Sequence, residues 1–177
     1  MTTRVWEGRY IAVEKQGSWE YAVRNRGIEA AVIVAVDRGE DGPHLLLVEQ
    51  FRVPIGRRCL ELPAGLIGDE EEGEALETAA VRELEEECGY RAAAIERLGV
   101  FHSSPGMTSE AFTLVRATGL TRVGEGGGHE GEGITVHRVP LAGLAAFADA
   151  KRAEGCAVDA KMLLVLGPAL LAASPRA

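Results

Sequence analysis

Short runs of apolar residues, separated by turn residues, predict strands along most of the chain. Residues 5–14 and 19–24 are each of strand length, and the turn at residues 16–18 predicts that they form an N-terminal hairpin. Residues 134–139 alternate between apolar and polar side chains, which is typical of a strand with one buried face. The other runs of strand length are residues 30–36, 45–49, 95–101 and 110–117.

A four-residue repeat predicts a helix in the middle of the chain. Its apolar side chains would lie in one stripe along the helix. They are Leu76, Ala80, Leu84 and Cys88. Gly89 follows the last of them and is placed to end the helix in a left-handed cap. Two more helices are expected towards the C-terminus, over residues 141–153 and, with Asp159 as N-cap, over residues 160–166.

Strands and helices are mixed in the sequence without a regular strand–helix–strand repeat. This order indicates an α/β (α+β) sandwich, in which helices pack on a mixed β-sheet. We divide the chain into an N-terminal β-hairpin arm, residues 1–26, and one domain, residues 27–177. The arm holds both tryptophans and two of the three tyrosines. Because an isolated hairpin is marginally stable in water, we expect the arm to pack on another surface.

The composition of the chain mainly argues against certain classes of function. The chain has 177 residues, a net charge of −8 and no basic stripe, which argues against nucleic-acid binding. The longest apolar run, residues 162–173, is interrupted by Gly167-Pro168 and is too short to span a bilayer. The first residues lack the charged and apolar regions of a signal peptide, so we expect none. Three scattered cysteines without metal-ligand spacing fit a reducing cytoplasm.

Three glutamates of the central helix indicate metal chemistry. Glu83, Glu86 and Glu87 stand at positions i, i+3 and i+4, so they share one face of the helix. Like charges at this spacing repel each other and weaken a helix, which makes sense if a cation binds between them. Carboxylate oxygens suit hard ions such as Mg²⁺ or Mn²⁺, which bridge to substrate phosphates. The plainer alternative is a solvated acidic helix.

The stretch from Gly68 to Tyr90 resembles the signature of the Nudix hydrolases, G-x5-E-x7-R-E-U-x-E-E-x-G-U, where U is aliphatic. Tyr90 stands at the last position, where an aliphatic residue is usual. The positions that match in register are Gly68, Glu74, Arg82, Glu83, Leu84, Glu86, Glu87 and Gly89. The resemblance implies an α/β/α sandwich and an enzyme that hydrolyses a diphosphate linkage with Mg²⁺ or Mn²⁺.

Segments beyond the signature are similar to the ADP-ribose pyrophosphatase branch of that family. They are residues 48–52, 60–65, 104–106 and 130–134. Pro105, in a Ser-Pro-Gly turn, is taken in that branch as a marker for ADP-ribose, which would be cleaved to AMP and ribose 5-phosphate. GDP-mannose hydrolases share these segments, so another nucleoside diphosphate derivative stays open. A non-catalytic module that senses a nucleotide is a further alternative.

The resemblance also implies roles for single residues. The expected metal ligands are Glu83, Glu86, Glu87 and the backbone carbonyl of Ala64. Carboxylates that bind cations are poor proton acceptors, so the general base should come from elsewhere. We expect it to be Glu132 in the glycine loop, residues 124–133, with Glu130 as the next choice and Glu86 sharing the work. The glycines predict that this loop is mobile and closes over the substrate.

Substrate contacts are expected from Arg52, Glu61, Trp19 and Pro105. Arg52 stands at a strand end, where its guanidinium could hold a phosphate bidentately, although a plain surface arginine is the alternative. Trp19 offers a flat face for adenine, with packing inside the hairpin as the alternative. Glu61 could contact substrate or metal. The histidines show no metal-ligand spacing and are given no role: His44, His102, His129 and His137.

The arm also predicts the oligomeric state. An aromatic-rich hairpin at a chain end needs a surface to cover it, and exchanging an identical element between two copies is a low-cost route to a dimer. The chain is similar in this respect to dimeric ADP-ribose pyrophosphatases. We therefore expect two partners, a small nucleotide substrate and a second copy of the chain, and neither nucleic acid nor membrane.

Overall fold

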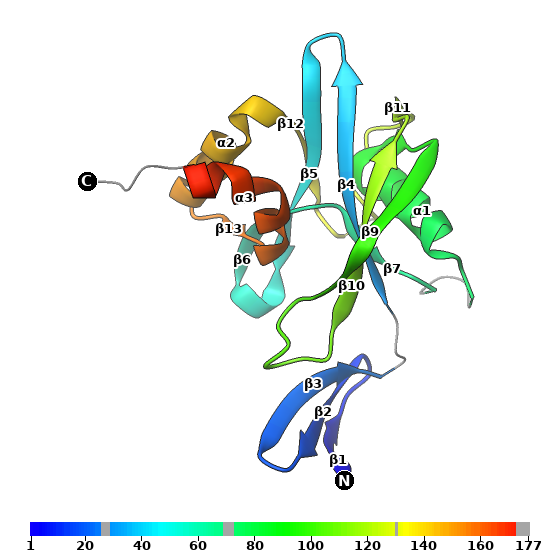
Figure 1. Ribbon diagram of the computed structural model, residues 1–177, viewed down its shortest axis with the longest axis vertical. Helices are drawn as coiled ribbons and strands as arrows, with labels where there is room; N and C mark the ends of the chain where they lie inside the picture. The colour runs from blue at the N-terminus through cyan, green and yellow to red at the C-terminus, as the bar shows by residue number, and fades with distance from the viewer. Residues whose placement is uncertain (26–28, 69–72, 130, 173–177) are drawn as a thin grey trace.

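A computed structural model describes residues 1–25, 29–68, 73–129 and 131–172 (Figure 1). The strands are β1 Thr2–Glu7, β2 Ile11–Gln16, β3 Trp19–Arg24, β4 Ala30–Gly39, β5 Gly42–Arg52, β6 Arg57–Glu61, β7 Ala64–Leu66, β8 Tyr90–Arg91, β9 Ala94–His102, β10 Ala111–Thr118, β11 Thr121–Arg122, β12 Thr135–Pro140 and β13 Ala157–Val158. The helices are α1 Leu76–Cys88, α2 Leu144–Ala153 and α3 Leu163–Ala172, with the 3₁₀ helices η1 Val53–Ile55, η2 Leu141–Gly143 and η3 Ala160–Met162.

The largest sheet mixes parallel and antiparallel strands. Its order is β13-β6-β5-β4-β10-β9, with β12 paired to β5 and β7 paired to β4. β10 runs parallel to β4 and β13 parallel to β6, whereas β5 is antiparallel to β4, β6 and β12. Figure 1 shows α1 on one side of β4 and β5, and α2 and α3 on the other. The predicted α/β sandwich with a mixed sheet is therefore confirmed.

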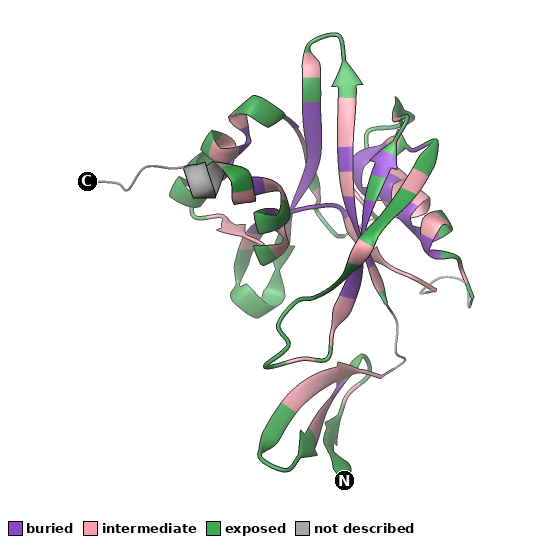
Figure 2. Cartoon of the chain, viewed as in Figure 1, coloured by how far each residue is buried: buried purple, intermediate pink, exposed green. Residues whose placement is uncertain are grey.

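Neighbouring residues of the central strands point to opposite faces of the sheet and so build two cores. Ile33 and Val48 pack in one cluster with Leu84 of α1, whereas Val32 and Leu47 belong to a second cluster. The side chains of α2, η3 and α3 that complete the second cluster are Leu144, Ala148, Met162 and Leu166. Figure 2 shows the buried residues gathered on the central strands and on the inner side of α1.

The central helix forms where its apolar repeat predicts. All four stripe residues are buried: Leu76, Ala80, Leu84 and Cys88. Gly89 ends the helix with φ +72°, and its N–H donates to the carbonyl of Glu85 at 2.9 Å. The expected cap near the C-terminus is also confirmed, because the Asp159 carboxylate accepts the backbone N–H of Lys161 at 2.7 Å. Local sequence thus fixes the end of α1 and the start of η3.

The predicted hairpin is confirmed as β2 and β3, but the prediction of one strand over residues 5–14 is wrong, because a third strand, β1, completes the sheet of the N-terminal arm. Residues 5–14 do not form one strand, because a turn closed by the Gly8 N–H donating to the Ile11 carbonyl separates β1 from β2. β2 pairs with both β1 and β3. The arm contacts the domain through the backbone of Ala22 and through an ion pair of 2.6 Å between Arg24 and Glu110. The expected boundary at residue 26 lies outside the described residues.

In the part of the chain that the structure describes, no helix combines the length and apolar character needed to cross a membrane.

Candidate active site

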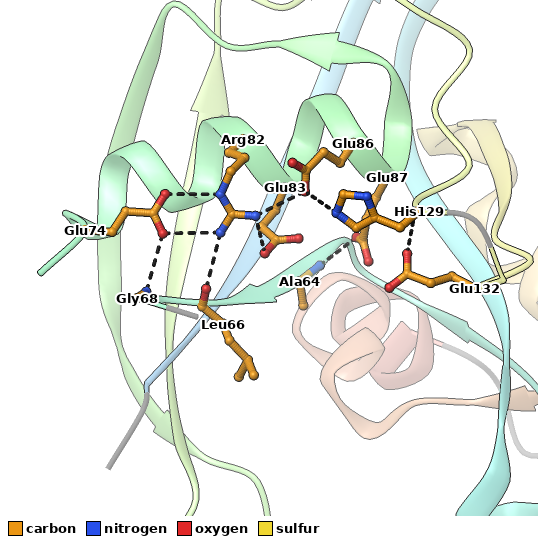
Figure 3. A network of polar contacts seen from close by, with 10 residues as sticks. All are labelled: Ala64, Leu66, Gly68, Glu74, Arg82, Glu83, Glu86, Glu87, His129 and Glu132. Carbon is orange, nitrogen blue, oxygen red and sulfur yellow. Dashed lines mark hydrogen bonds and ion pairs between the residues drawn. The ribbon is translucent and has the colours of Figure 1, made fainter. Parts of the chain in front are cut away.

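Helix α1 presents three carboxylates to strand β7. Glu83 lies so close to this strand that a Cβ on Gly65 would fall 1.8 Å from the Glu83 carboxyl carbon. The next strand residue back, Ala64, donates its N–H to the Glu87 carboxylate at 3.0 Å. Figure 3 shows this bond between Ala64 and Glu87, which ties α1 to β7. The site therefore depends on a glycine whose role the sequence did not reveal.

Burial makes two of these carboxylates unusual. Glu87 is 7% exposed, and burial raises its pKa to about 8, although the Ala64 N–H acts in the opposite direction. Burial likewise raises the pKa of Glu83, while its ion pair with Arg82 acts to lower it. Groups of this kind keep their negative charge at a cost in free energy. A cation bound between them would offset that cost.

Arg82 holds the acidic face together. Its guanidinium donates to both oxygens of Glu74, at 3.1 and 3.2 Å, and to Glu83 and Glu86 at 3.0 and 3.1 Å. A further bond of 3.5 Å reaches the carbonyl of Leu66 on β7. Figure 3 shows this guanidinium between Glu74 on one side and the helix carboxylates on the other. Arg82 thus ties α1 to the segment before it and to β7.

The glycine loop docks on the last turn of α1. The N–H groups of Gly127 and Gly128 donate to the carbonyls of Glu87 and Glu86, each at 2.9 Å. Gly126 has φ +70°, and a Cβ there would lie 2.5 Å from the backbone of Cys88. The loop glycines therefore permit close contact with the helix end, where the sequence predicted a mobile loop. They also occupy helix carbonyls that would otherwise lack partners.

The loop brings Glu132 to the carboxylates of α1. A cavity of about 310 Å³ is lined by Glu132 and by all three helix glutamates, Glu83, Glu86 and Glu87, as well as by Gln50, Arg52, Ala64, Gly65, Leu66, Arg82 and His129. The Glu132 carboxylate accepts the His129 N–H at 2.8 Å. Glu125, by contrast, is exposed beside Arg122 and does not line this cavity. Glu130, also expected to take part, lies outside the described residues.

His129 and Gln50 are cavity residues that the sequence reading missed. The ring of His129 lies 3.5 Å from the Glu86 carboxylate. Histidine spacing gave no signal, because the loop reaches the helix through the fold and not through sequence proximity. The position of His129 between the loop glycines, three residues before Glu132, is the signal that could have found it.

Arg52 lies on a wall of the acidic cavity, and Glu61, which lines the neighbouring cavity, pairs with it. The Arg52 guanidinium donates bidentately to the Glu61 carboxylate, with both distances 2.7 Å, and Glu61 is 2% exposed. Arg52 also lines a neighbouring cavity of about 580 Å³, and strand β7 forms part of both walls. Glu61 thus occupies Nε and Nη2 of Arg52, the fork that was expected to hold a phosphate bidentately.

Trp19 and Pro105 lie in a different place. They line a cleft of about 330 Å³ between the arm and the turn at residues 104–106, together with Gln16 and Tyr21. The Trp19 ring is exposed. Among the described residues, this cleft and the carboxylate cavity share no lining residue. One copy of the chain therefore brings Trp19 and Pro105 to each other but not to the acidic cavity.

The acidic cavity fits a hard cation in its chemistry. Its walls carry four carboxylates, two of which have pKa values raised by burial. Oxygen donors of this kind suit Mg²⁺ or Mn²⁺. As their side chains stand, no three His, Cys, Asp or Glu residues of the described segments are gathered at metal-binding distances.

The family of the chain follows from comparison with known proteins. A model of the NUDIX domain matches residues 27–157, which is well over half of the chain. The chain therefore belongs to the Nudix family. The matched region contains the sheet, α1 and the glycine loop that together form the acidic cavity.

Individual relatives agree with this assignment. The chain is similar to an ADP-ribose pyrophosphatase of Saccharomyces cerevisiae, with 37% identity over 107 residues that cover 57% of this chain and 45% of that protein. It is also similar to a GDP-mannose pyrophosphatase of Cronobacter sakazakii, with 34% identity over 155 residues, covering 81% and 74%. The chain spans about half the length of several curated relatives that it matches.

Among solved structures, the chain is similar to the crystal structure of an ADP compounds hydrolase. The TM-score is 0.68 at 25% identity, and the match covers 97% of this chain and 92% of that one. The match thus extends over nearly the whole chain.

Proposed function

We propose that the protein is a divalent-metal-dependent hydrolase that cleaves the diphosphate linkage of ADP-ribose to give AMP and ribose 5-phosphate. The observation that carries the proposal is the cavity in which the glutamates of α1 face Glu132 of the glycine loop. Membership of the Nudix family supports the reaction. Similarity to an ADP-ribose pyrophosphatase and to an ADP compounds hydrolase supports the substrate class.

The residues that would hold Mg²⁺ or Mn²⁺ are Glu83, Glu86, Glu87 and the backbone carbonyl of Ala64. A divalent cation supplies the positive charge that a diphosphate needs when water attacks it. Arg82 supports this role because its guanidinium, 3.0 Å from Glu83 and 3.1 Å from Glu86, keeps these two carboxylates on the same side of α1. Burial of Glu87 supports it as well, because a buried anion favours a bound cation.

Glu132 is proposed to take the proton of the attacking water. Cation-binding carboxylates are poor proton acceptors, and Glu132 stands on another wall of the same cavity. The His129 N–H orients its carboxylate. The water oxygen bonds to one phosphorus while the bridging oxygen leaves with the other phosphate, so the products are two monophosphates. Glu86 and Glu130 are proposed to share in handling this water.

Arg52 is proposed to contact the diphosphate, with Glu61 orienting its guanidinium. Its place on the wall between two cavities supports this role, because the linkage to be cut would lie beside the carboxylates while the rest of the substrate extends into the neighbouring cavity. The size of that cavity, about 580 Å³, falls within the ordinary range for small-molecule sites.

We also propose that the working form is a homodimer in the cytoplasm. Within one copy, the cleft of Trp19 and Pro105 lies apart from the acidic cavity, so adenine stacking on Trp19 would draw on the arm of a second copy. The exposed aromatic and aliphatic residues of the arm support such a contact: Val5, Trp6, Tyr10, Ile11 and Trp19. The free thiols of Cys59, Cys88 and Cys156 fit a reducing compartment.

GDP-mannose is the second candidate substrate. The similarity to a GDP-mannose pyrophosphatase covers 81% of this chain, a larger share than the similarity to the ADP-ribose pyrophosphatase of Saccharomyces cerevisiae. The chemistry at the diphosphate would be the same. Base and sugar contacts alone would differ.

A substrate panel tests the proposal. Purified protein is incubated with Mg²⁺ and with ADP-ribose, ADP-glucose, GDP-mannose or diadenosine polyphosphate, and products are separated by chromatography. We expect ADP-ribose to be among the best substrates and EDTA to abolish its turnover. Strong cleavage of GDP-mannose with negligible cleavage of ADP-ribose would refute ADP-ribose as the substrate but would still support hydrolysis of a diphosphate linkage. No cleavage of any compound would favour a nucleotide-sensing module.

A further inference from the structure

A buried anion with three cationic or polar partners lies beside the proposed active site. Glu49 of β5 is 8% exposed and accepts bonds from Arg58 of β6 at 2.5 Å and from His137 of β12 at 2.9 Å. Lys151 of α2 lies 3.1 Å away. Burial acts to raise the Glu49 pKa, but these partners outweigh it and hold the pKa at about 2. The cluster joins four elements and takes no part in the steps proposed above.

Arg58 reaches from this cluster to the end of the glycine loop. One nitrogen of its guanidinium donates to the carbonyl of Glu49 at 2.6 Å, to the hydroxyl of Thr135 at 2.9 Å and to the carbonyl of Gly133 at 3.3 Å. Gly133 directly follows Glu132 in the chain. Thr135 opens β12 and pairs with Glu49 in the sheet. Arg58 thus joins the buried anion to the residues that follow Glu132.

The backbone beside Glu132 has little stiffness of its own. Gly131 and Gly133 flank it with φ +99° and +60°, values that glycine adopts at low cost but does not enforce. On the other side, the loop is held by Gly127 and Gly128 on the carbonyls of α1. Glu132 also bonds to His129, through its carboxylate at 2.8 Å and through its N–H at 3.2 Å. The rest of its support comes from an anchor at each end of the loop, and Arg58 acts with the pairing of β12 on β5 as the second one.

We propose that Arg58, fixed by Glu49, is a positioning residue that holds Glu132 over the carboxylates of α1. The proposal rests on the proposed function, in which Glu132 accepts the proton of the attacking water. Arg58 touches neither that water nor the substrate, since it does not line the acidic cavity. Its effect on the reaction passes through the backbone of Gly133 and Thr135.

A double-mutant cycle tests this coupling, with Arg58→Ala, Glu132→Gln and the combined variant assayed for kcat and KM on ADP-ribose. We expect Arg58→Ala to lower kcat by about tenfold to a hundredfold with KM nearly unchanged, because small displacements of a reacting group are costly. In the Glu132→Gln background, Arg58→Ala should cause little further loss, since residues that act through one another are not additive.

Two variants separate positioning from plain stability. Lys151→Met removes another partner of the same Glu49 carboxylate but leaves the loop contacts intact, so it should lower Tm and leave kcat within about twofold. Arg58→Lys keeps a cation near Glu49 but lacks the fork that reaches Gly133 and Thr135. It should fold and still lose kcat, and it replaces Arg58→Ala if that variant does not fold.

Hydrogen exchange gives a readout that needs neither metal nor activity. In metal-free protein, the amides of residues 131–135 should exchange faster in Arg58→Lys than in wild type, and Lys151→Met should resemble wild type there. Equal exchange in all three proteins would overturn the positioning role of Arg58 and leave the proposed function standing. The same conclusion would follow if the losses of kcat from Arg58→Ala and Glu132→Gln multiplied in the combined variant. A Glu132→Gln variant with wild-type kcat would instead refute the base assignment, and the positioning role would fall with it.

Discussion

At the scale of single residues, a glycine shapes the acidic cavity as much as the charged residues do. Gly65 gives Glu83 room beside β7, and no other residue type would fit without moving that carboxylate. The acidic residues of α1 could be predicted from sequence, because their spacing is a local property. The role of Gly65 could not, because the distance between β7 and α1 depends on how the two elements pack.

We expect Gly65→Ala to displace Glu83 and lower ADP-ribose turnover by about tenfold or more. The crowding should also reduce the free energy of unfolding by about 1–3 kcal/mol. Turnover at saturating Mg²⁺ and urea denaturation check the two effects. Gly143→Ala is the control, because a Cβ on Gly143 meets no heavy atom within 4 Å. Equal activity of both variants would contradict the role of Gly65.

Burial of Glu87 predicts a stability change that depends on pH. The folded-state pKa is raised from 4.5 to about 8, so the metal-free protein loses stability as the pH rises through that window. Glu87→Gln removes the group that causes this loss. In EDTA, urea denaturation should therefore find Glu87→Gln more stable than wild type at pH 8, with a smaller difference at pH 5.

Glu85→Gln is the matched control for that experiment. Glu85 lies on the same helix, but Arg91 pairs with it at 2.5 Å and lowers its pKa. Its replacement should bring no gain at pH 8. If metal-free Glu87→Gln is less stable than wild type at pH 8, the carboxylate is structural and the metal-ligand role is wrong.

At the scale of elements, the sequence predicts helices and caps that depend on neighbouring residues, but not the packing of a loop on a distant helix. The stripe of α1 and its Gly89 cap follow from four-residue periodicity and one glycine. The glycine content of residues 124–133 predicts a mobile loop. In the structure, however, Gly126 to Gly128 lie against the end of α1. The sequence predicts one strand over residues 5–14 because only Glu7, Gly8 and Arg9 separate the apolar residues of β1 from those before and in β2, too short a break to reveal the turn.

We expect Gly126→Ala to lift the glycine loop from α1, because φ +70° and the 2.5 Å approach to Cys88 both exclude a side chain. Turnover should fall strongly, and Tm should drop by several degrees. Gly124→Ala is the control in the same loop, since its Cβ would come no closer than 4.0 Å to any neighbour. Wild-type kcat in Gly126→Ala would show that docking does not matter for catalysis.

At the scale of the whole molecule, sequence predicts the layers but not the strand order. The parallel pairing of β10 with β4 joins segments far apart in the chain, and no local pattern encodes it. Among the groups of exposed apolar side chains in the described residues, two bear on the oligomeric state. One is on the arm, and the other is on β9 at the edge of the sheet, where Leu98 and Val100 are exposed (Figure 2).

We expect these two surfaces to meet in a homodimer. Light scattering at micromolar concentration should give twice the chain mass of 18.8 kDa. Val100→Glu should shift the protein towards monomer, because a charge would enter the covered surface. Leu163→Glu, at an exposed leucine of α3, is the control and should stay dimeric. A wild-type monomer with full activity would contradict this assembly.

The central claim is that the carboxylate cavity hydrolyses a diphosphate with Glu132 as the base. The most direct test is the kcat for ADP-ribose of wild type, Glu132→Gln, Glu130→Gln and Glu125→Gln, with substrate and Mg²⁺ binding measured separately by calorimetry. We expect Glu132→Gln to lose about a hundredfold or more in kcat while binding both. Glu130→Gln should be milder and Glu125→Gln near wild type. Near-wild-type kcat in all three variants would contradict the account.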